Sequence, residues 1–170
     1  MRPFIAGPIA AAAMVLTVTL PALAQSITVS LVPSAVTFTL SNGSSSNPGN
    51  AAVVVSTTWL LLSAGRTISL YGYFSDAAAA LAHTSPANTY NIPSSRVEVS
   101  VNAGANGPFD QTVPFGGAAA GRLLFSVLVT GLITSGARAD SLGFNINLNG
   151  YTLPADTYGG TFRVRARVTP

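Results

Sequence analysis

The residues that could support acid–base or nucleophilic catalysis are few and lie far apart along the chain. His83 is the only histidine, in a segment rich in Ser, Thr, Pro and Ala without a neighbouring acidic residue. A Ser-His-Asp arrangement would therefore need distant partners, and a solvated loop histidine explains the position better. The carboxylates are scattered singly, which fits solvated loops and caps, although two that converge in space would suffice for a glycosidase. They are Asp76, Glu98, Asp110, Asp140 and Asp156.

Metal and phosphate chemistry also lack the residues that they need. The chain has no cysteine and one histidine, which excludes the usual zinc ligand sets, and neither Asp110 nor Asp140 begins the closely spaced ligand run of a calcium loop. Residues 116–121 have the glycine spacing of a phosphate-binding loop, but Arg122 and Leu123 stand where Lys and Ser or Thr are required. We predict no catalytic residue, no metal and no cofactor, and we do not expect an enzyme.

Two rows of polar side chains are better candidates for a functional surface. In an extended chain alternate residues share a face and lie about 6.6 Å apart. If a turn at Asn149-Gly150 makes neighbours of the last two strands, the rows lie side by side and offer forked donors to sugar hydroxyls, uronic acids or lipid phosphate. The alternative is a solvated outer face whose charges discourage edge-to-edge pairing. The rows are Asn145, Asn147 and Asn149, and Arg163, Arg165 and Arg167.

A second, weaker candidate surface is aromatic. Tyr71 and Tyr73 alternate with apolar residues and would share the outer face of a strand. Tyrosines in such positions bind glycans in some proteins, but more often they pair with side chains across the strands.

The elements that would position these residues are strands, because apolar residues recur at every second position along most of the chain. The segment 52–62 is a nearly continuous apolar run and predicts a strand covered on both faces. Loops are predicted at 41–50, 76–93 and 103–121, the second with one or two helical turns at 77–82 and the third with a short edge strand at 111–115. The other predicted strands are 27–31, 36–40, 67–74, 96–101, 122–130, 142–148 and 161–168. Many short strands without helical periodicity predict an all-β fold, an immunoglobulin-like antiparallel β-sandwich of seven to eight strands.

The start of the chain predicts export. Arg2 supplies a positive end, an apolar run extends from Phe4 to Leu20, and small residues at 21–24 fit a cleavage site. We predict a signal peptide at 1–24 and one β-sandwich domain at 25–170, with no membrane span in the mature chain. Removing 24 of 170 residues leaves 146, with seven arginines against five carboxylates, a net charge of +2. This charge is too small for nucleic-acid binding, and a fold without cysteines must be stabilised by its core and sheet hydrogen bonds.

The end of the chain carries a family resemblance. Leu153-Pro-Ala-Asp-Thr-Tyr158 leads into an alternating terminal strand and resembles the closing motif of secreted bacterial spore-coat-U-like and fimbrial pilin domains. The resemblance implies an immunoglobulin-like fold and polymerisation in which an N-terminal segment completes the neighbour's sheet. The matching segment is 26–32, where Ile27, Val29 and Leu31 would fill alternate pockets. The cysteine pair frequent in those pilins is absent, however, and seven strands are already predicted after Val32. A body of seven strands would need no donor, and 26–32 would then pack on its own sheet.

These observations favour an exported, non-enzymatic structural protein located in the periplasm, at the cell surface or outside the cell. It would be a subunit of an extracellular fibre, pilus or coat that assembles by β-strand addition with copies of itself or with other fibre subunits. The alternative function is a surface or periplasmic recognition domain that binds glycan or protein through the polar rows or the long loops.

Overall fold

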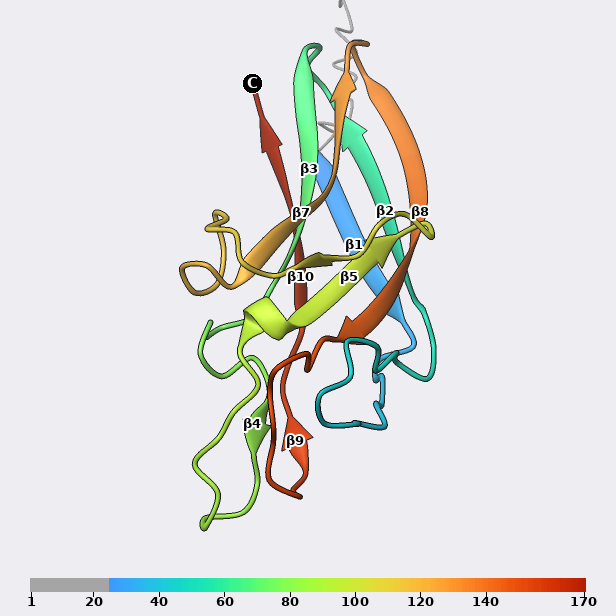
Figure 1. Cartoon of the computed structure of the whole chain (residues 1–170). Helices are drawn as coiled ribbons and strands as arrows, with labels where there is room; N and C mark the ends of the chain where they lie inside the picture. The colour runs from blue at the N-terminus through green and yellow to red at the C-terminus, as the bar shows by residue number, and fades with distance from the viewer. Residues whose placement is uncertain (1–24) are drawn as a thin grey trace, which may run out of the picture.

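The computed structural model describes residues 25–170, which form two facing β-sheets with a small third sheet at one end (Figure 1). The all-β prediction is confirmed, and the one helix in this range is a single 3-10 turn, η1. The predicted signal peptide lies outside the described residues. The strands are β1 Ser26–Val32, β2 Val53–Leu61, β3 Arg66–Tyr73, β4 Ala82–His83, β5 Val97–Val101, β6 Gly107–Pro108, β7 Gly121–Val129, β8 Thr134–Ile146, β9 Tyr158–Gly159 and β10 Arg163–Thr169, with η1 at Ser94–Arg96.

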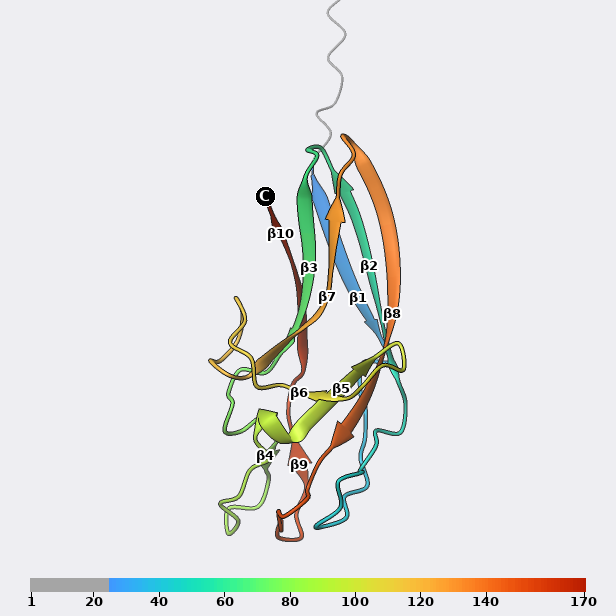
Figure 2. The ribbon, with the colours of Figure 1, turned by 45° about the horizontal axis from the view of Figure 1, so that its top comes forward.

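The two main sheets are antiparallel. The first has the strand order β1-β2-β8-β5-β6 and the second the order β10-β3-β7. The long strands run along the molecule, and the β4–β9 pair lies at the end opposite the hairpins that join β2 to β3 and β7 to β8 (Figures 1 and 2). Among residues 25–170 no helix is long and apolar enough to span a membrane.

The core lies between the two sheets and is formed by alternate residues of their strands. On β2, Val53, Val55 and Leu61 are buried while Val54 is exposed, so the prediction that 52–62 is covered on both faces is wrong. Only one face of β2 packs against the second sheet. The aromatic part of the core joins residues from both sheets and from the loops, with neighbouring ring centroids 4.9–5.8 Å apart. Its members are Phe74, Phe109, Phe144 and Phe162.

Some predicted elements are replaced by irregular backbone. The segment 36–40 forms only an isolated bridge between Phe38 and Gly49, because an Asn50 side chain, rather than a strand, accepts from the Thr37 amide at 2.9 Å. Helical turns at 77–82 and an edge strand at 111–115 do not form either; Gln111 makes a single bridge to Gly121.

The chain does turn at Asn149-Gly150, where the Tyr151 amide donates to the Leu148 carbonyl at 2.9 Å. The prediction that this turn makes neighbours of the last two strands is wrong. β8 pairs with β2 and β5, whereas β10 pairs with β3 in the other sheet. Residues 151–162, which include β9, separate the turn from β10 and carry the chain from one sheet to the other.

An ion pair lies on the inner side of β8. Asp140 is 1% exposed and accepts from Arg138 Nε and Nη2, each at 2.6 Å, and from Asn102 Nδ2 at 2.7 Å. The Arg138 guanidinium lies over the Phe125 ring, 4.6 Å from its centroid. Asp140 is therefore a buried strand residue, not the loop residue that was predicted.

Candidate functional site

On one side of the sandwich the edge strands of the two sheets, β1 and β10, lie next to each other but form no ladder with each other, so this side is open to a further strand. Within residues 25–170, β1 forms a ladder only with β2, and β10 only with β3, although β1 and β10 lie close together. Their inward residues are partly buried against the core. An extended partner could add backbone hydrogen bonds to either edge. The inward residues are Ile27, Val29 and Leu31 on β1 and Val164, Ala166 and Val168 on β10.

The predicted assembly strand lies on its own sheet in this structure. All seven residues of β1 pair with β2, with Ile27 opposite Trp59, Val29 opposite Thr57 and Leu31 opposite Val55. β1 ends before Pro33, which lacks an amide hydrogen and so cannot continue the donor pattern of a ladder. Whether another copy of the chain can use the same strand stays a prediction.

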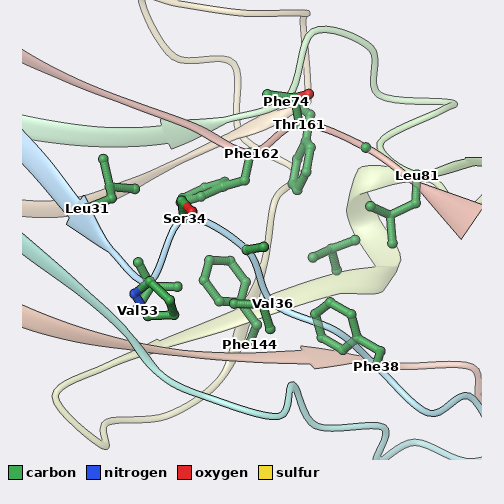
Figure 3. Close-up of a pocket in the computed structure, with 14 residues that line it drawn as sticks. Leu31, Ser34, Val36, Phe38, Val53, Phe74, Leu81, Phe144, Thr161 and Phe162 are labelled. Carbon is green, nitrogen blue, oxygen red and sulfur yellow. The ribbon is translucent and has the colours of Figure 1, made fainter.

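A pocket of about 290 Å³ continues the open side beyond the end of β1 (Figure 3). It lies between residues 33–38 and the segment 160–162 that precedes β10. Figure 3 shows Leu31 at one end of the pocket and Phe38 at the other, with Phe144 and Phe162 between them. Most of the lining side chains are apolar, so the pocket suits the aliphatic or aromatic side chain of a partner rather than a polar ligand.

We define the open side as β1, β10 and this pocket. Sequence reasoning found both strands but missed the pocket, because segments far apart in the chain build its walls. Val53 comes from β2, Phe144 from β8 and Phe162 from the entry to β10. In the sequence each of these residues follows the same apolar alternation as any core residue. That pattern shows which residues face inward but not where the core leaves a cavity.

The arginine row lies on the outer face of β10, and all three side chains are exposed. Arg163 donates to the Ser75 hydroxyl, and the Arg165 guanidinium lies 4.7 Å from the centroid of the Phe115 ring. Phe115 also contacts two tyrosine rings of β3 at 5.9 Å, an arrangement that sequence reasoning missed because Phe115 comes from a long loop. Opposite Arg163, Arg165 and Arg167 in the ladder stand Tyr73, Tyr71 and Ser69.

The asparagine row lies at and just beyond the end of β8, in the β1-β2-β8-β5-β6 sheet, whereas the arginine row lies on β10 of the second sheet. The structure therefore does not bring the two rows together. Glu98 accepts from Asn145 Nδ2 at 2.8 Å and from Asn147 Nδ2 at 2.9 Å. Asn145 Oδ1 also accepts from the Asn47 amide at 2.8 Å. The Asn149 carbonyl accepts from Arg96 Nη1 at 3.0 Å. These hydrogen bonds link the asparagine row to the loop before β2, to β5 and to η1. The side-chain amides of Asn145 and Asn147 are thus already engaged within the protein and have little capacity to bind a ligand.

The Leu153–Tyr158 motif also has a structural role. Leu153 is buried, and its amide and carbonyl both bond to the Asn42 side chain at 2.9 Å. Asp156 accepts from Asn88 Nδ2, Ser85 N, Thr157 N and Thr84 Oγ1. The hydrogen bond from Asn88 is the main cause that lowers the pKa of Asp156 to about 2. The motif thus holds two loops against the chain just before β10.

Of the residues considered for catalysis, His83 and Asp156 both bond to the segment 84–85. His83 lies in β4, where its Nδ1 is 2.8 Å from the Ser85 carbonyl oxygen. Within the described range 25–170, no group of three His, Asp or Glu side chains comes close enough to hold a metal ion.

Comparison with known proteins adds no relative to this picture. The chain matches no protein-family model, no curated protein and no solved structure. The open side and the arginine row are therefore the features from which a function can be argued.

Proposed function

We propose that this chain is an exported, non-enzymatic subunit of an extracellular fibre, pilus or coat, with an immunoglobulin-like sandwich that assembles by β-strand addition. The observation that carries the proposal is the position of β1. Among residues 25–170 it is the first strand, it is an edge strand held by one ladder, and it borders the edge strand of the other sheet and an apolar pocket.

Exchange of β1 between copies costs little in contacts. A strand that leaves its own sheet and occupies the same place on a neighbour recovers the same seven-residue ladder with β2 and the same apolar contacts of Ile27, Val29 and Leu31. The hinge must lie between the end of β1 and Val36, because later residues of the connecting segment 33–52 pack on the core or, as Asn42 and Asn47 do, bond to other segments. The equilibrium is then set largely by protein concentration, as for other domain-swapped assemblies.

The geometry of the exchange decides what forms. Two copies that exchange β1 reciprocally make a closed dimer, whereas donation from each copy to the next makes an open chain, because a heterologous contact that does not close propagates. The free β10 edge and the pocket lie beside the receiving position, where they favour a further contact from the incoming subunit.

A reversible lock tests the proposal. Thr28 and Thr58 are exposed and directly opposite each other on β1 and β2. A directly opposed antiparallel pair has a Cα separation of about 4.5–5.5 Å, which suits a disulfide. In the full chain, a Thr28→Cys/Thr58→Cys variant should remain monomeric when oxidised and form oligomers or fibres when reduced, as seen by light scattering and negative-stain microscopy.

A matched control separates the lock from any general effect of a disulfide. Thr67 and Thr169 are opposite each other on β3 and β10, so a Thr67→Cys/Thr169→Cys variant ties the other edge and leaves β1 free. It should assemble in both redox states, although the bond stiffens β10. Monomers of the wild type at all concentrations, or equal assembly of the oxidised and reduced lock, would refute exchange of β1.

A further inference from the structure

The outer face of the β10-β3-β7 sheet combines cationic and aromatic side chains in one patch. We call it the arginine–aromatic face. It combines a row from β10, a row from β3 and one ring from the loop before β7. Its members are Arg163, Arg165, Arg167, Tyr71, Tyr73 and Phe115.

Within the described residues 25–170 no carboxylate pairs with the arginines of this face. The only ion pair among residues 25–170 joins Arg138 to Asp140 on β8, in the other sheet. Three of the seven arginines in this range thus share one strand without a paired carboxylate. A guanidinium binds a carboxylate through two parallel hydrogen bonds, so the row has the chemistry of a receptor for repeated carboxylates.

The aromatic rings hold the face in a defined shape. Phe115 lies 5.9 Å from both Tyr71 and Tyr73, and the Arg165 guanidinium lies over it. Because Arg165 rests on a ring, it loses less freedom when it binds a ligand than an arginine without such support. The half-buried rings also offer apolar surface beside the cations, which suits the C–H face of a pyranose.

The spacing favours a polymer over a single anion. The three arginines project from alternate positions of one strand, about 6.6 Å apart, so they form a line rather than a pocket. We propose that the arginine–aromatic face binds a linear, carboxylate-bearing polysaccharide laid along β10 and β3. A lipid surface is the less favoured partner, because insertion needs apolar side chains that project past the charges, whereas Arg165 covers Phe115 and the exposed Leu123 and Leu128 lie on β7, across β3 from the arginine row. The proposal does not depend on assembly, although a fibre would repeat the face and raise avidity.

Polygalacturonate, a linear polyuronate, is a suitable probe, and uncharged amylose is its control. The full chain should bind polygalacturonate but not amylose, and binding should weaken from 50 to 500 mM NaCl because salt screens exposed charges. An Arg165→Gln/Arg167→Gln variant should lose affinity by about tenfold or more, since each lost charge-assisted bond contributes substantially. An Arg96→Gln variant removes one charge from η1, outside the β10-β3-β7 sheet, and should stay within about twofold of wild type, as expected for a distant screened charge.

Further arms keep the result interpretable. An Arg165→Lys/Arg167→Lys variant keeps both positive charges but cannot form the two parallel hydrogen bonds of a guanidinium. Its affinity should therefore lie between those of the Arg165→Gln/Arg167→Gln variant and the wild type. Thermal unfolding checks that each variant is folded. Absence of polygalacturonate binding by the wild type, equal losses in the two glutamine variants, or equal affinities of the lysine and glutamine variants would overturn the proposal. Binding to vesicles with 30% phosphatidylglycerol in place of the polyuronate would overturn it in favour of a membrane surface.

Discussion

Replacement of Arg138 by Met should destabilise the protein in a way that depends on pH. In the wild type, burial raises the pKa of Asp140, but hydrogen bonds from Arg138 and Asn102 and the charge of Arg138 outweigh burial and leave that pKa below its ordinary value. Methionine keeps an apolar side chain of similar reach but removes the guanidinium, which lies over the Phe125 ring and pairs with Asp140. Asp140 then stays buried as a carboxylate with only the Asn102 amide as partner.

The size of the effect follows from the burial of the two side chains. Removing one partner of a buried pair costs about 3–5 kcal/mol. The Asp140 side chain is 2% exposed but that of Arg138 is 39% exposed, so water already screens part of the interaction. We expect a loss of about 2–3 kcal/mol in the free energy of unfolding at pH 7. For a chain of this length that loss lowers Tm by roughly 5–10 °C.

The dependence on pH distinguishes a buried charge from simple loss of packing. In the wild type, the lowered pKa means that the contribution of Asp140 is present above the unfolded pKa of about 3.9 and is lost as the pH falls below it. In Arg138→Met, burial is opposed only by the Asn102 hydrogen bond and raises the pKa of Asp140, so protonation on acidification stabilises the folded state. The difference in Tm between wild type and variant should therefore shrink from pH 7 to pH 4.

Calorimetry or circular dichroism between pH 4 and 7 measures this difference. Arg96→Met is the matched control, because Arg96 also lies over a ring, that of Tyr151 at 5.2 Å, but has no carboxylate partner. Its effect on Tm should not vary with pH. A difference for Arg138→Met that is absent, or that is the same at pH 4 and pH 7, would refute the assignment of Asp140 as a buried, paired carboxylate.

Two further predictions concern the segment before β10. Because hydrogen bonds lower the pKa of Asp156 to about 2, its contribution to stability should be complete above pH 4 and lost as the pH falls through 2; Asp156→Asn should remove that acid transition and speed amide exchange at Ser85. Gly72→Ala should destabilise the fold by about 1–3 kcal/mol, because the new Cβ would lie 2.7 Å from the Phe162 ring, which core aromatics hold in place. Gly159→Ala, whose Cβ would meet nothing within 4 Å, is its control in denaturant unfolding, and equal effects of the two would contradict the packing described for Phe162.

The sequence predicted the half-buried strands well, since alternation reports directly which face is buried. It failed where that face is not apolar. The first half of β8 was missed because its inward residues include Gly136, Arg138 and Asp140, the first beneath Trp59 and the others forming an ion pair. At 36–40 the alternation does mark residues that face the core, but Asn50 replaces the strand that would have completed a ladder.

The candidate site was predictable only in its local parts. The exposure of Arg163, Arg165 and Arg167 follows from period-two alternation within one strand. Their neighbours do not, because strand order depends on how residues 151–162 cross between the sheets, and nothing in the Asn149-Gly150 turn specifies that path. Side-chain partners such as Glu98 for the asparagine row are separated from it by more than 40 residues.

The most direct test of the proposed function is whether β1 of one copy reaches β2 of another. Thr28→Cys and Thr58→Cys are made in separate full-length chains, which contain no other cysteine, and the two are mixed at high concentration and oxidised gently. Exchange predicts a Thr28–Thr58 linkage between the two chains, identified by mass spectrometry. Far less linkage is expected when Thr28→Cys is mixed with Thr89→Cys, an exposed site in the loop after β4, at the end of the molecule opposite the β2–β3 hairpin (Figure 1). Equal yields in both mixtures, or no linkage in the first, would contradict assembly through β1.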